Sequence, residues 1–371
     1  MRIGVPTEIK PQEYRVGLTP ESVAELVYDG QEVWVQSGAG AGIGADDTQY
    51  EQAGAVIKPD AASLFEHCEM IIKVKEPQKN ERAMLRPGQI LYTYLHLAPD
   101  APQTEGLIKS GAVCIAYETV TDETGELPLL KPMSQVAGRL APQVGAAALM
   151  KQGGGRGVLL GGVPGVSSGK VVIIGGGDVG YNAALMAIGQ QADVTILERS
   201  NKVMENLSYE FGVTANVRRS TPPVLKELIQ EADMVIGAVL IPGAAAPKLI
   251  TRDMLGLMKE GSVLVDVAID QGGCFETSKP TTHAKPTYIV DGIVHYCVAN
   301  MPGGVARTST YALNAATLYH AKRLARLGWK EAMRQDPHLL NGLNVCEGKL
   351  TYEAVAKAQG LEWVEPSSLI S

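Results

Sequence analysis

The sequence predicts an α/β protein with two doubly wound domains, each built on a parallel sheet. Three observations lead to this prediction. Short apolar or β-branched runs alternate with polar, helix-like stretches in two separate parts of the chain. A glycine-rich motif at residues 175–180 directly follows the first apolar run of the second part. At 371 residues the chain is also too long for a single core of ordinary size, so we expect two domains.

The first alternation occupies the N-terminal third of the chain. One helix start is explicit, because Thr19 can cap the first amides, Pro20 suits the first helical position and Gly30 can end the helix. Strands joined by helices in a parallel sheet produce this pattern. The strand-like runs are residues 2–5, 32–36, 70–74, 89–94 and 113–116.

A second alternation begins near Lys170. Its strand-like runs are residues 171–174, 194–197, 234–238, 262–267 and 288–290. Between the two alternations, residues 143–151 are helix-like and a glycine-rich run follows at 153–157. After Arg307 the chain becomes helical again through residues 312–326, which we expect to return to the first domain.

The composition excludes several classes of protein. The formal charge is −7, so the chain lacks the basic footprint of a nucleic-acid binder, and we expect small-molecule partners. The most apolar segment, residues 234–246, is interrupted by glycine and proline and is shorter than the roughly 20 residues that span a membrane. We expect no signal peptide. The five cysteines form no CxxC pair, which disfavours a zinc site and favours a reducing, cytoplasmic compartment.

The glycine-rich motif predicts a dinucleotide-binding turn of the Rossmann type. Gly175 permits the tight turn, Gly177 lets backbone amides approach a pyrophosphate, and Gly180 allows the helix to pack closely on the strand. Glu198 ends the next predicted strand 21 residues beyond Gly177, near the spacing at which an acid binds the ribose 2′-hydroxyl of NAD. The alternative is a structural turn with a surface glutamate. A Walker A reading fails, because Val171 stands where serine or threonine is needed.

Four further residues follow predicted strands, at the sheet edge where ligands of open α/β sheets bind. They are Arg15, Lys75 and His96 in the first domain and Asp270 in the second. An arginine suits a carboxylate, a lysine supplies a cation and a histidine exchanges protons near neutral pH, so the first three together suggest an amino- or keto-acid site. Taken singly, they could instead be solvated loop charges, a histidine satisfied within its loop and a capping aspartate. The other histidines show no metal or catalytic spacing.

These residues lie within longer motifs that resemble the L-alanine dehydrogenases nearly end to end. Several distinct motifs in order are more specific than one glycine motif. They are residues 4–10 (GVPTEIK), 15–20 (RVGLTP), 73–77 (KVKEP), 94–98 (YLHLA), 133–134 (MS), 137–139 (AGR), 267–273 (VAIDQGG) and 298–303 (VANMPG).

The resemblance implies a homohexamer whose active site lies in the cleft between two Rossmann-like domains. Residues 1–130 and a C-terminal helical part, 306–371, would form the substrate domain, and residues 131–305 the NAD-binding domain. Arg15 and Lys75 match the substrate-binding pair, and His96 and Asp270 match the catalytic pair. Positions that match cofactor contacts are Ser134, Ser220, Val239, Leu240, Val267, Ala268, Ile269, Asp270, Lys279, Val298, Ala299, Asn300 and Met301.

The sequence departs from the family pattern at three positions. Glu198 stands where the family more often has aspartate, and Val203 stands where a basic residue is frequent. Leu327 occupies a position at which some members carry a metal-associated histidine, so no metal is expected.

The reaction that the resemblance implies is the reversible, NAD-dependent oxidative deamination of L-alanine to pyruvate and ammonia. One alternative is the soluble NAD(H)-binding α subunit of a proton-translocating transhydrogenase. It is disfavoured because residues 133–139 differ from that family's Arg-Ala-Gln loop and because His96 is present. A second alternative is a dehydrogenase of the saccharopine or opine type, which the sequence disfavours only weakly.

Overall fold

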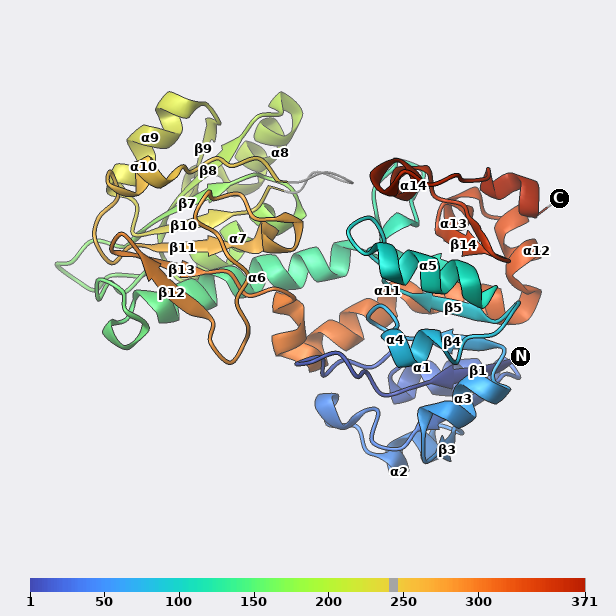
Figure 1. Ribbon diagram of the computed structural model, residues 1–371. Helices are drawn as coiled ribbons and strands as arrows, with labels where there is room; N and C mark the ends of the chain where they lie inside the picture. Colours follow the sequence, from blue (N-terminus) through green and yellow to red (C-terminus); the bar gives the residue numbers. More distant parts are fainter. Residues whose placement is uncertain (240–245, 371) are drawn as a thin grey trace. The chain divides into compact units, whose positions relative to one another are not determined.

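The computed structural model of the protein describes residues 1–239 and 246–370 (Figure 1). The chain divides into two compact units. The first unit combines both chain ends, Met1–Met133 and Gly303–Ser371, and the second is Ser134–Pro302. The division therefore falls inside helix α6 (Lys131–Leu149).

The first unit contains a sheet in the order β15-β14-β6-β5-β4-β1-β2-β3. Strands β1 to β6 are parallel, which confirms the five predicted strands, but β14 and β15 pair antiparallel at one edge. The sheet is therefore predominantly parallel, as expected, with antiparallel pairing at one edge. Its strands are β1 (Arg2–Val5), β2 (Glu32–Gln36), β3 (Val56–Lys58), β4 (Met70–Ile72), β5 (Ile90–Thr93), β6 (Val113–Ala116), β14 (Leu343–Cys346) and β15 (Lys349–Leu350).

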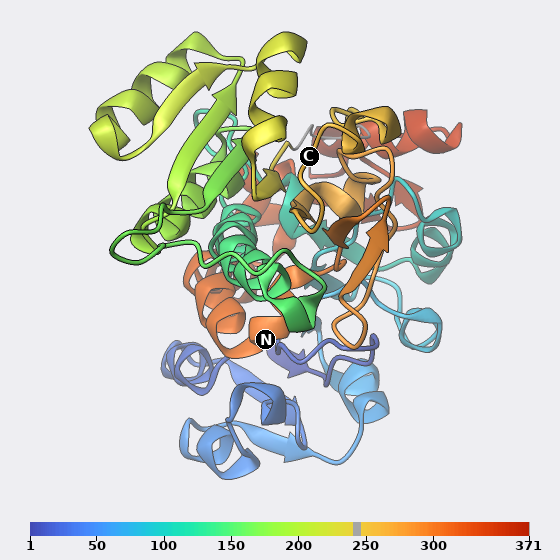
Figure 2. The same cartoon turned by 90° about the vertical axis from the view of Figure 1, so that its left-hand side faces the viewer.

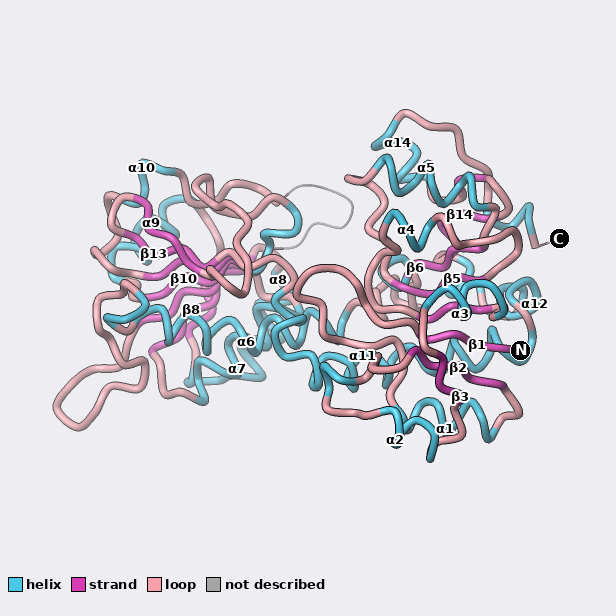
Figure 3. Tube along the Cα trace, turned by 60° about the horizontal axis from the view of Figure 1, so that its bottom comes forward, coloured by secondary structure: helices cyan, strands magenta, loops and turns pink. Residues whose placement is uncertain are grey.

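Helices lie on both faces of this sheet (Figure 3). Apolar side chains of α3, α5 and α14 pack in one core with strands β4 to β6. On β5, the Tyr92 hydroxyl donates to the Thr317 carbonyl of α11, 3.3 Å away. The helices of the unit are α1 (Pro20–Tyr28), α2 (Asp47–Gln52), α3 (Ala61–His67), α4 (Lys79–Arg82), α5 (Ala101–Ser110), α11 (Ala306–Leu327), α12 (Trp329–Arg334), α13 (Pro337–Leu340) and α14 (Glu353–Gln359), with 3₁₀ turns η1 (Ala41–Ile43), η2 (Tyr117–Thr119) and η7 (Pro366–Leu369).

The predicted start of the first helix is confirmed. The Thr19 hydroxyl accepts a hydrogen bond from the Ser22 amide at 3.2 Å, and Pro20 is the first helical residue. Gly30 follows the helix with φ of +82°, a left-handed conformation that favours glycine.

The second unit contains a sheet in the order β12-β13-β11-β10-β7-β8-β9. The strands from β13 to β9 are parallel, whereas β12 pairs antiparallel with β13 and forms a hairpin at the edge opposite β9 (Figure 2). The run at 288–290, expected in a parallel sheet, therefore belongs to an antiparallel edge strand. The strands are β7 (Lys170–Ile174), β8 (Asp193–Glu198), β9 (Asn216–Arg219), β10 (Met234–Gly237), β11 (Val263–Asp266), β12 (Thr287–Val290) and β13 (Ile293–Tyr296).

This second sheet is doubly wound, as predicted. One apolar core joins it to α6, α7 and α8, and another core on the opposite face joins it to α9 and α10 (Figure 1). These elements are α7 (Asp178–Gly189), α8 (Asn201–Phe211), α9 (Pro222–Glu231) and α10 (Arg252–Leu255), with 3₁₀ turns η3 (Lys151–Gly153), η4 (Gly212–Thr214), η5 (Val267–Gln271) and η6 (Met301–Val305).

Helix α6 begins well before the predicted helix-like stretch and continues through Pro142. Its close packing on α7 explains the difference, since a Cβ on Gly138 would lie 2.3 Å from the Val179 carbonyl oxygen. Glycine and proline, which locally disfavour a helix, are here accommodated by tertiary packing. Within the described ranges, no helix is long and apolar enough to cross a membrane.

Candidate functional site

Three of the predicted site residues follow adjacent parallel strands of the first unit. Lys75 follows β4, His96 follows β5, and Arg15 lies in the connection after β1. Strands β5, β4 and β1 are neighbours in the sheet, so their carboxyl ends share one edge. The Thr93 hydroxyl at the end of β5 donates to the Lys75 carbonyl at 3.0 Å and ties two of these ends together.

Arg15 is a buried side chain, not a solvated loop charge. Its Nε and Nη2 donate to the two carboxylate oxygens of Glu13 at 2.7 and 2.6 Å, and Nη1 lies 3.0 Å from the Met133 sulfur. Burial disfavours the charge, but the hydrogen bonds and charge of Glu13 outweigh it and raise the pKa of Arg15. The guanidinium is therefore fixed and charged.

The turn that carries Lys75 is held by Glu8. One Glu8 oxygen accepts hydrogen bonds from the amides of Val74 and Lys75 at 2.6 and 3.3 Å. The other lies 3.0 Å from the Nζ of Lys73, which also pairs with Glu81 at 2.7 Å. Lys73 is fully buried, whereas Lys75 is only half-buried. Two lysines in one turn thus occupy different environments.

His96 is exposed and has a φ of +51°, which is unusual for a residue other than glycine. The carboxylate of Glu118 accepts a hydrogen bond from the His96 amide at 2.6 Å and from the Leu95 amide at 3.1 and 3.2 Å. The His96 ring lies 5.6 Å from the ring of Tyr94. Its side chain is consequently available to a ligand while its backbone is fixed.

Buried tyrosines support this edge of the sheet. Tyr117 contacts Tyr92 and Tyr94 edge to face, with ring centres 4.4 and 5.0 Å apart. Tyr117 donates to the Lys73 carbonyl at 3.0 Å and Tyr94 to the Leu129 carbonyl at 2.6 Å. Burial raises the pKa of each of these tyrosines well above its ordinary value. They are neutral structural donors and not proton-transfer groups.

In the second unit, the glycine motif forms the predicted turn between β7 and α7. Gly175 has φ of +101°, and a Cβ there would lie 2.7 Å from the Ala238 carbonyl oxygen. A Cβ on Gly180 would collide with the Gly175 carbonyl. Gly177 caps α7 and faces open space, with no heavy atom within 4 Å of its Cβ position. The turn thus offers room and helix N-terminal amides to a pyrophosphate.

Glu198 lies beside this turn at the end of β8. One carboxylate oxygen accepts from the Gly176 amide at 2.7 Å, and the other accepts from the Arg199 and Ser200 amides at 2.6 and 2.9 Å. The Ser220 amide donates to the Glu198 carbonyl at 2.8 Å. The predicted ribose acceptor therefore has a fixed position next to the glycine turn.

The segment that contains Asp270 is organised by Asp266. This fully buried carboxylate ends β11 and accepts from the Ala268 amide at 3.1 Å and the Cys274 amide at 2.9 Å, and it also bonds the Ser278 hydroxyl. Burial raises the pKa of Asp266, against the hydrogen bonds from Ser278 and Cys274. Asp270 itself is exposed in η5. Like His96, it presents an accessible side chain.

The remaining predicted cofactor residues lie on several elements of the second unit. Val239 follows β10 and approaches Gly175, where a Cβ would lie 3.2 Å from its Cγ2. The Lys279 amide donates to the Tyr288 hydroxyl at 2.7 Å. Asn300 has φ of +59°, and its carbonyl lies 3.2 Å from Nε2 of His283. Ser134 lies on α6, Val267, Ala268 and Ile269 lie in η5, Val298 and Ala299 precede Asn300, and Met301 begins η6, whereas Leu240 lies outside the described residues.

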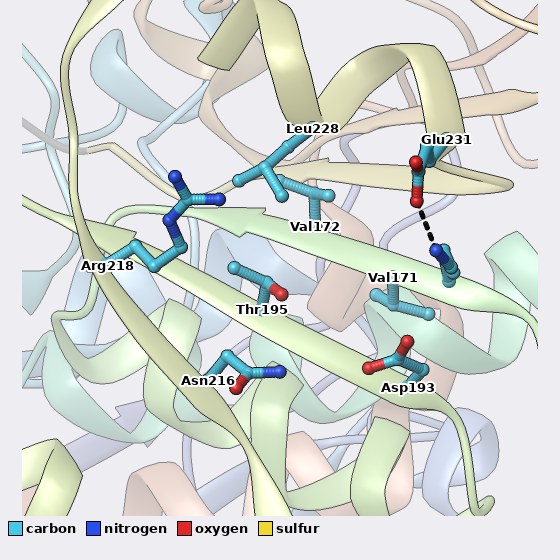
Figure 4. Close-up of a pocket in the computed structure, with 9 residues that line it drawn as sticks. Val171, Val172, Asp193, Thr195, Asn216, Arg218, Leu228 and Glu231 are labelled. Atoms are coloured by element: carbon cyan, nitrogen blue, oxygen red, sulfur yellow. Dashed lines mark hydrogen bonds and ion pairs between the residues drawn. The ribbon is translucent and has the colours of Figure 1, made fainter. Parts of the chain in front are cut away.

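The second unit also contains a hollow of about 300 Å³, which lies away from the glycine turn (Figure 4). It is lined by Lys170, Asp193 and Asn216, which begin β7, β8 and β9, and so lies toward the ends of these strands away from the glycine turn. Lys170 pairs with Glu231, and Arg218 pairs with Glu227 at 2.7 Å. This hollow is therefore distinct from the predicted cofactor position.

Four carboxylates that hold site residues were not predicted from the sequence. Glu8, Glu13 and Glu118 support the first unit's residues, and Asp266 supports η5. Glu8 lies within the opening motif, but its bonds to the amides of Val74 and Lys75, which are far away in sequence, leave no local pattern of residue types. All five cysteines are buried free thiols, and in the described part of the chain no three histidine, cysteine or acidic residues are grouped to hold a metal ion.

Comparisons with known proteins cover almost the whole chain. Residues 4–137 match the family described as "Alanine dehydrogenase/PNT, N-terminal domain", and residues 141–353 match its C-terminal domain. Alanine dehydrogenase of Halomonas elongata is 60% identical over 370 residues, which cover 100% of both chains. A solved L-alanine dehydrogenase is 49% identical with a TM-score of 0.94, covering 97% of this chain and 99% of that chain. A solved transhydrogenase from Sinorhizobium meliloti has a TM-score of 0.83 at 24% identity, covering 95% of this chain and 100% of that chain, which shows the shared fold alone.

Proposed function

The chain belongs to the alanine dehydrogenase family, and we propose that it catalyses the reversible, NAD-dependent oxidative deamination of L-alanine to pyruvate and ammonia. The family consists of NAD-dependent oxidoreductases that act on a CH–NH₂ group. The observation that carries the proposal is the 60% identity to an alanine dehydrogenase over the full length of both chains. We assign the substrate to the first unit and NAD to the second.

Arg15 and Lys75 are proposed to bind the substrate. A guanidinium that is already fixed by Glu13 loses little further side-chain freedom when it takes up a carboxylate. Lys75, on the turn held by Glu8, supplies a cation to the carbonyl or imine region of the substrate. This pair of cations suits a small amino acid or keto acid.

The second unit fits NAD. The open face of Gly177 leaves room for the pyrophosphate, and Glu198 beside the turn suits the ribose hydroxyls. Bound NAD⁺ supplies the hydride acceptor for the Cα hydrogen of alanine. The other proposed contacts, Ser134, Ser220, Val239, Leu240, Lys279 and the segments at 267–270 and 298–301, follow from the family resemblance.

We propose that His96 transfers protons and that Asp270 orients the water molecule that adds to the imine. The substrate amine must be neutral before hydride leaves Cα, and water must then add to the imine carbon. The resulting carbinolamine needs a proton on nitrogen before ammonia departs. The imidazole of His96 is exposed and can take up or release a proton, and a carboxylate orients water and stabilises a cationic imine.

We further propose that the protein is a cytoplasmic homohexamer. The family resemblance supports the assembly, and the free thiols of all five cysteines support a reducing compartment. Some apolar side chains are exposed and could pack against another subunit. Leu159 is 68% exposed and Val166 is 64% exposed.

The decisive experiment follows NADH absorbance with purified protein. NAD⁺ is supplied with each of a panel of amino acids, and NADH is supplied with ammonia and each of a panel of keto acids. We expect alanine and pyruvate to be the preferred pair. Silence with every amino acid combined with hydride exchange between two nucleotides would overturn the proposal and indicate a transhydrogenase.

A further inference from the structure

The backbone at His96 is held in a conformation that histidine rarely adopts. Its φ of +51° lies in the left-handed region, where a Cβ meets steric resistance. The flanking residues Leu95 and Leu97 are buried, whereas His96 is exposed. The left-handed turn thus projects one polar side chain from an apolar segment.

A single carboxylate holds this turn by its amides. Glu118 Oε1 accepts from the His96 amide at 2.6 Å and the Leu95 amide at 3.1 Å, and Oε2 lies 3.2 Å from the same Leu95 amide. Two successive amides that point at one anion form a cradle, which compensates the cost of the left-handed residue. Glu118 can serve both amides because it lies in η2, directly after β6, the neighbour of β5.

Other side chains hold the same segment only at its flanks. Gln103 donates to the Leu95 carbonyl at 2.7 Å, and Gln359 donates to the Leu97 carbonyl at 2.7 Å. Among the described residues, Glu118 is the one whose side chain binds the backbone of His96 itself. Its carboxylate is therefore placed to decide the direction of the His96 side chain.

We propose that Glu118 is a positioning residue for the reaction, acting through the backbone of His96 to aim the imidazole at the substrate. This inference rests on the proposed function. Glu118 transfers no proton itself, because its carboxylate is committed to the amides of Leu95 and His96. Substitution of Glu118 should consequently lower kcat when His96 is present and should have little effect on kcat when His96 is absent.

The test is a double-variant comparison of Glu118→Gln and His96→Ala. Glutamine keeps the side-chain volume, but it is neutral, so its bonds to the two amides are weaker, and its NH₂ group replaces the oxygen that accepts from the Leu95 amide at 3.2 Å. We expect Glu118→Gln to lower kcat at least tenfold in the native background, with the KM for NAD⁺ within twofold of native. In the His96→Ala background the same substitution should change kcat less than twofold.

The matched control is Gln89→Leu, at the other end of β5. Gln89 is buried and donates to the Phe65 and Cys68 carbonyls at 2.9 and 2.7 Å, so its loss perturbs the same part of the sheet without touching the His96 turn. We expect this variant to melt at a lower temperature and to keep its kcat within about twofold. Glu118→Asp, whose shorter side chain cannot span both amides, is measured alongside in case Glu118→Gln does not fold.

The outcomes separate the inference from the proposed function. Equal loss of kcat in both backgrounds would show a general structural role and overturn the inference. Native kcat in both Glu118 variants would overturn it as well. Native protein that does not oxidise alanine overturns the proposed function and this inference with it, whereas active native protein with unaffected Glu118 variants overturns the inference alone.

Discussion

Glu13 and Arg15 form a bidentate ion pair that is buried within the first unit, with N–O distances of 2.7 and 2.6 Å. The pair is local, since the two residues are separated by one position. A buried guanidinium without this partner would carry an uncompensated charge. Glu13 therefore stabilises the fold and also presets the cation that we propose to bind the substrate carboxylate.

Removing Glu13 is expected to affect stability and substrate binding together. Glu13→Gln should lower the free energy of unfolding by about 3–5 kcal/mol, the usual cost of leaving one partner of a buried pair, and should raise the KM for alanine. Urea unfolding and steady-state kinetics measure the two effects. In the double variant Glu13→Leu/Arg15→Met, stability should recover while alanine binding does not. Recovery of alanine binding in that double variant would show that Arg15 does not bind the substrate.

Lys73 and Lys75 provide a matched pair in one turn. Lys73 is fully buried between Glu8 and Glu81, so Lys73→Met should lower the free energy of unfolding by about 3–5 kcal/mol. Lys75 is half-buried, and Lys75→Met should leave stability nearly unchanged while raising the KM for alanine and lowering kcat. Chemical unfolding and initial rates on both variants check this. If the two variants showed the same profile, the distinction between a structural and a substrate-binding lysine would fail.

His96→Ala and Asp270→Ala should each lower kcat at least a hundredfold, because a positioned proton-transfer group commonly contributes about 10²–10⁴-fold. Both side chains are exposed, so we expect melting temperatures close to native. NADH binding, followed by fluorescence titration, should survive the change at His96. Near-native turnover of the His96 variant with saturating alanine and NAD⁺ would refute its assignment.

The strands and the glycine turn could be predicted because each depends on residues that are consecutive in the sequence. Runs such as 2–5 and 171–174 are apolar enough to be strands wherever they occur. Strand β3 was missed because Val56–Lys58 is short and partly exposed, and β14 was missed because Asn344 interrupts its apolar run. In the structure, Asn344 is buried and donates to Thr119 at 2.8 Å, a partner far away in sequence.

In the site, too, features that depend on neighbouring residues could be predicted, and features that depend on distant residues could not. Arg15, Lys75, His96 and Asp270 could be named from their places after predicted strands. The role of Glu118 could not, because it depends on amides 22 and 23 positions away and on the adjacency of β5 and β6. A carboxylate that binds backbone amides leaves no pattern of residue types in the sequence.

Buried histidine predicts how stability responds to acid. Ile293 O can only accept, so Nδ1 of His295 carries the hydrogen at 2.9 Å, and Nε2 accepts from the Thr277 hydroxyl at 2.7 Å. Burial lowers the pKa of His295, although the carbonyl bond and the charges of Asp266 and Asp291 oppose it. As the pH falls below about 6.5, the ordinary pKa of histidine, His295 therefore binds a proton in the unfolded chain before it does so in the folded protein.

The free energy of unfolding should consequently decrease below that pH, by up to about 1.4 kcal/mol per pH unit from this group. His295→Gln should flatten the decrease. His67→Gln, which replaces an exposed histidine, is the control and should leave the slope unchanged. Urea unfolding between pH 5 and 8 measures the slopes. Identical slopes for native protein and His295→Gln would show that His295 does not titrate differently in the folded and unfolded states.

The protein should prefer NAD to NADP, because of the position of Glu198. A carboxylate beside the glycine turn accepts hydrogen bonds from ribose hydroxyls and repels a 2′-phosphate. The nearby arginines that could attract that phosphate have partners, since Arg218 binds Glu227 at 2.7 and 3.1 Å and Arg219 binds Asn201 at 2.6 Å. Arg199, the residue after β8, is exposed, and its amide donates to Glu198 at 2.6 Å.

Glu198→Ser should therefore narrow the preference for NAD, chiefly by improving kcat/KM for NADP. Serine cannot replace the bonds to the Gly176, Arg199 and Ser200 amides, so some loss of efficiency with NAD is expected as well. Glu210→Ser is the control, because Glu210 is an exposed carboxylate on α8 that bonds the Tyr181 hydroxyl at 3.0 Å, and it should leave the ratio unchanged. The measurement is kcat/KM for both nucleotides at saturating alanine. Equal or better use of NADP by the native protein would show that Glu198 does not face the ribose.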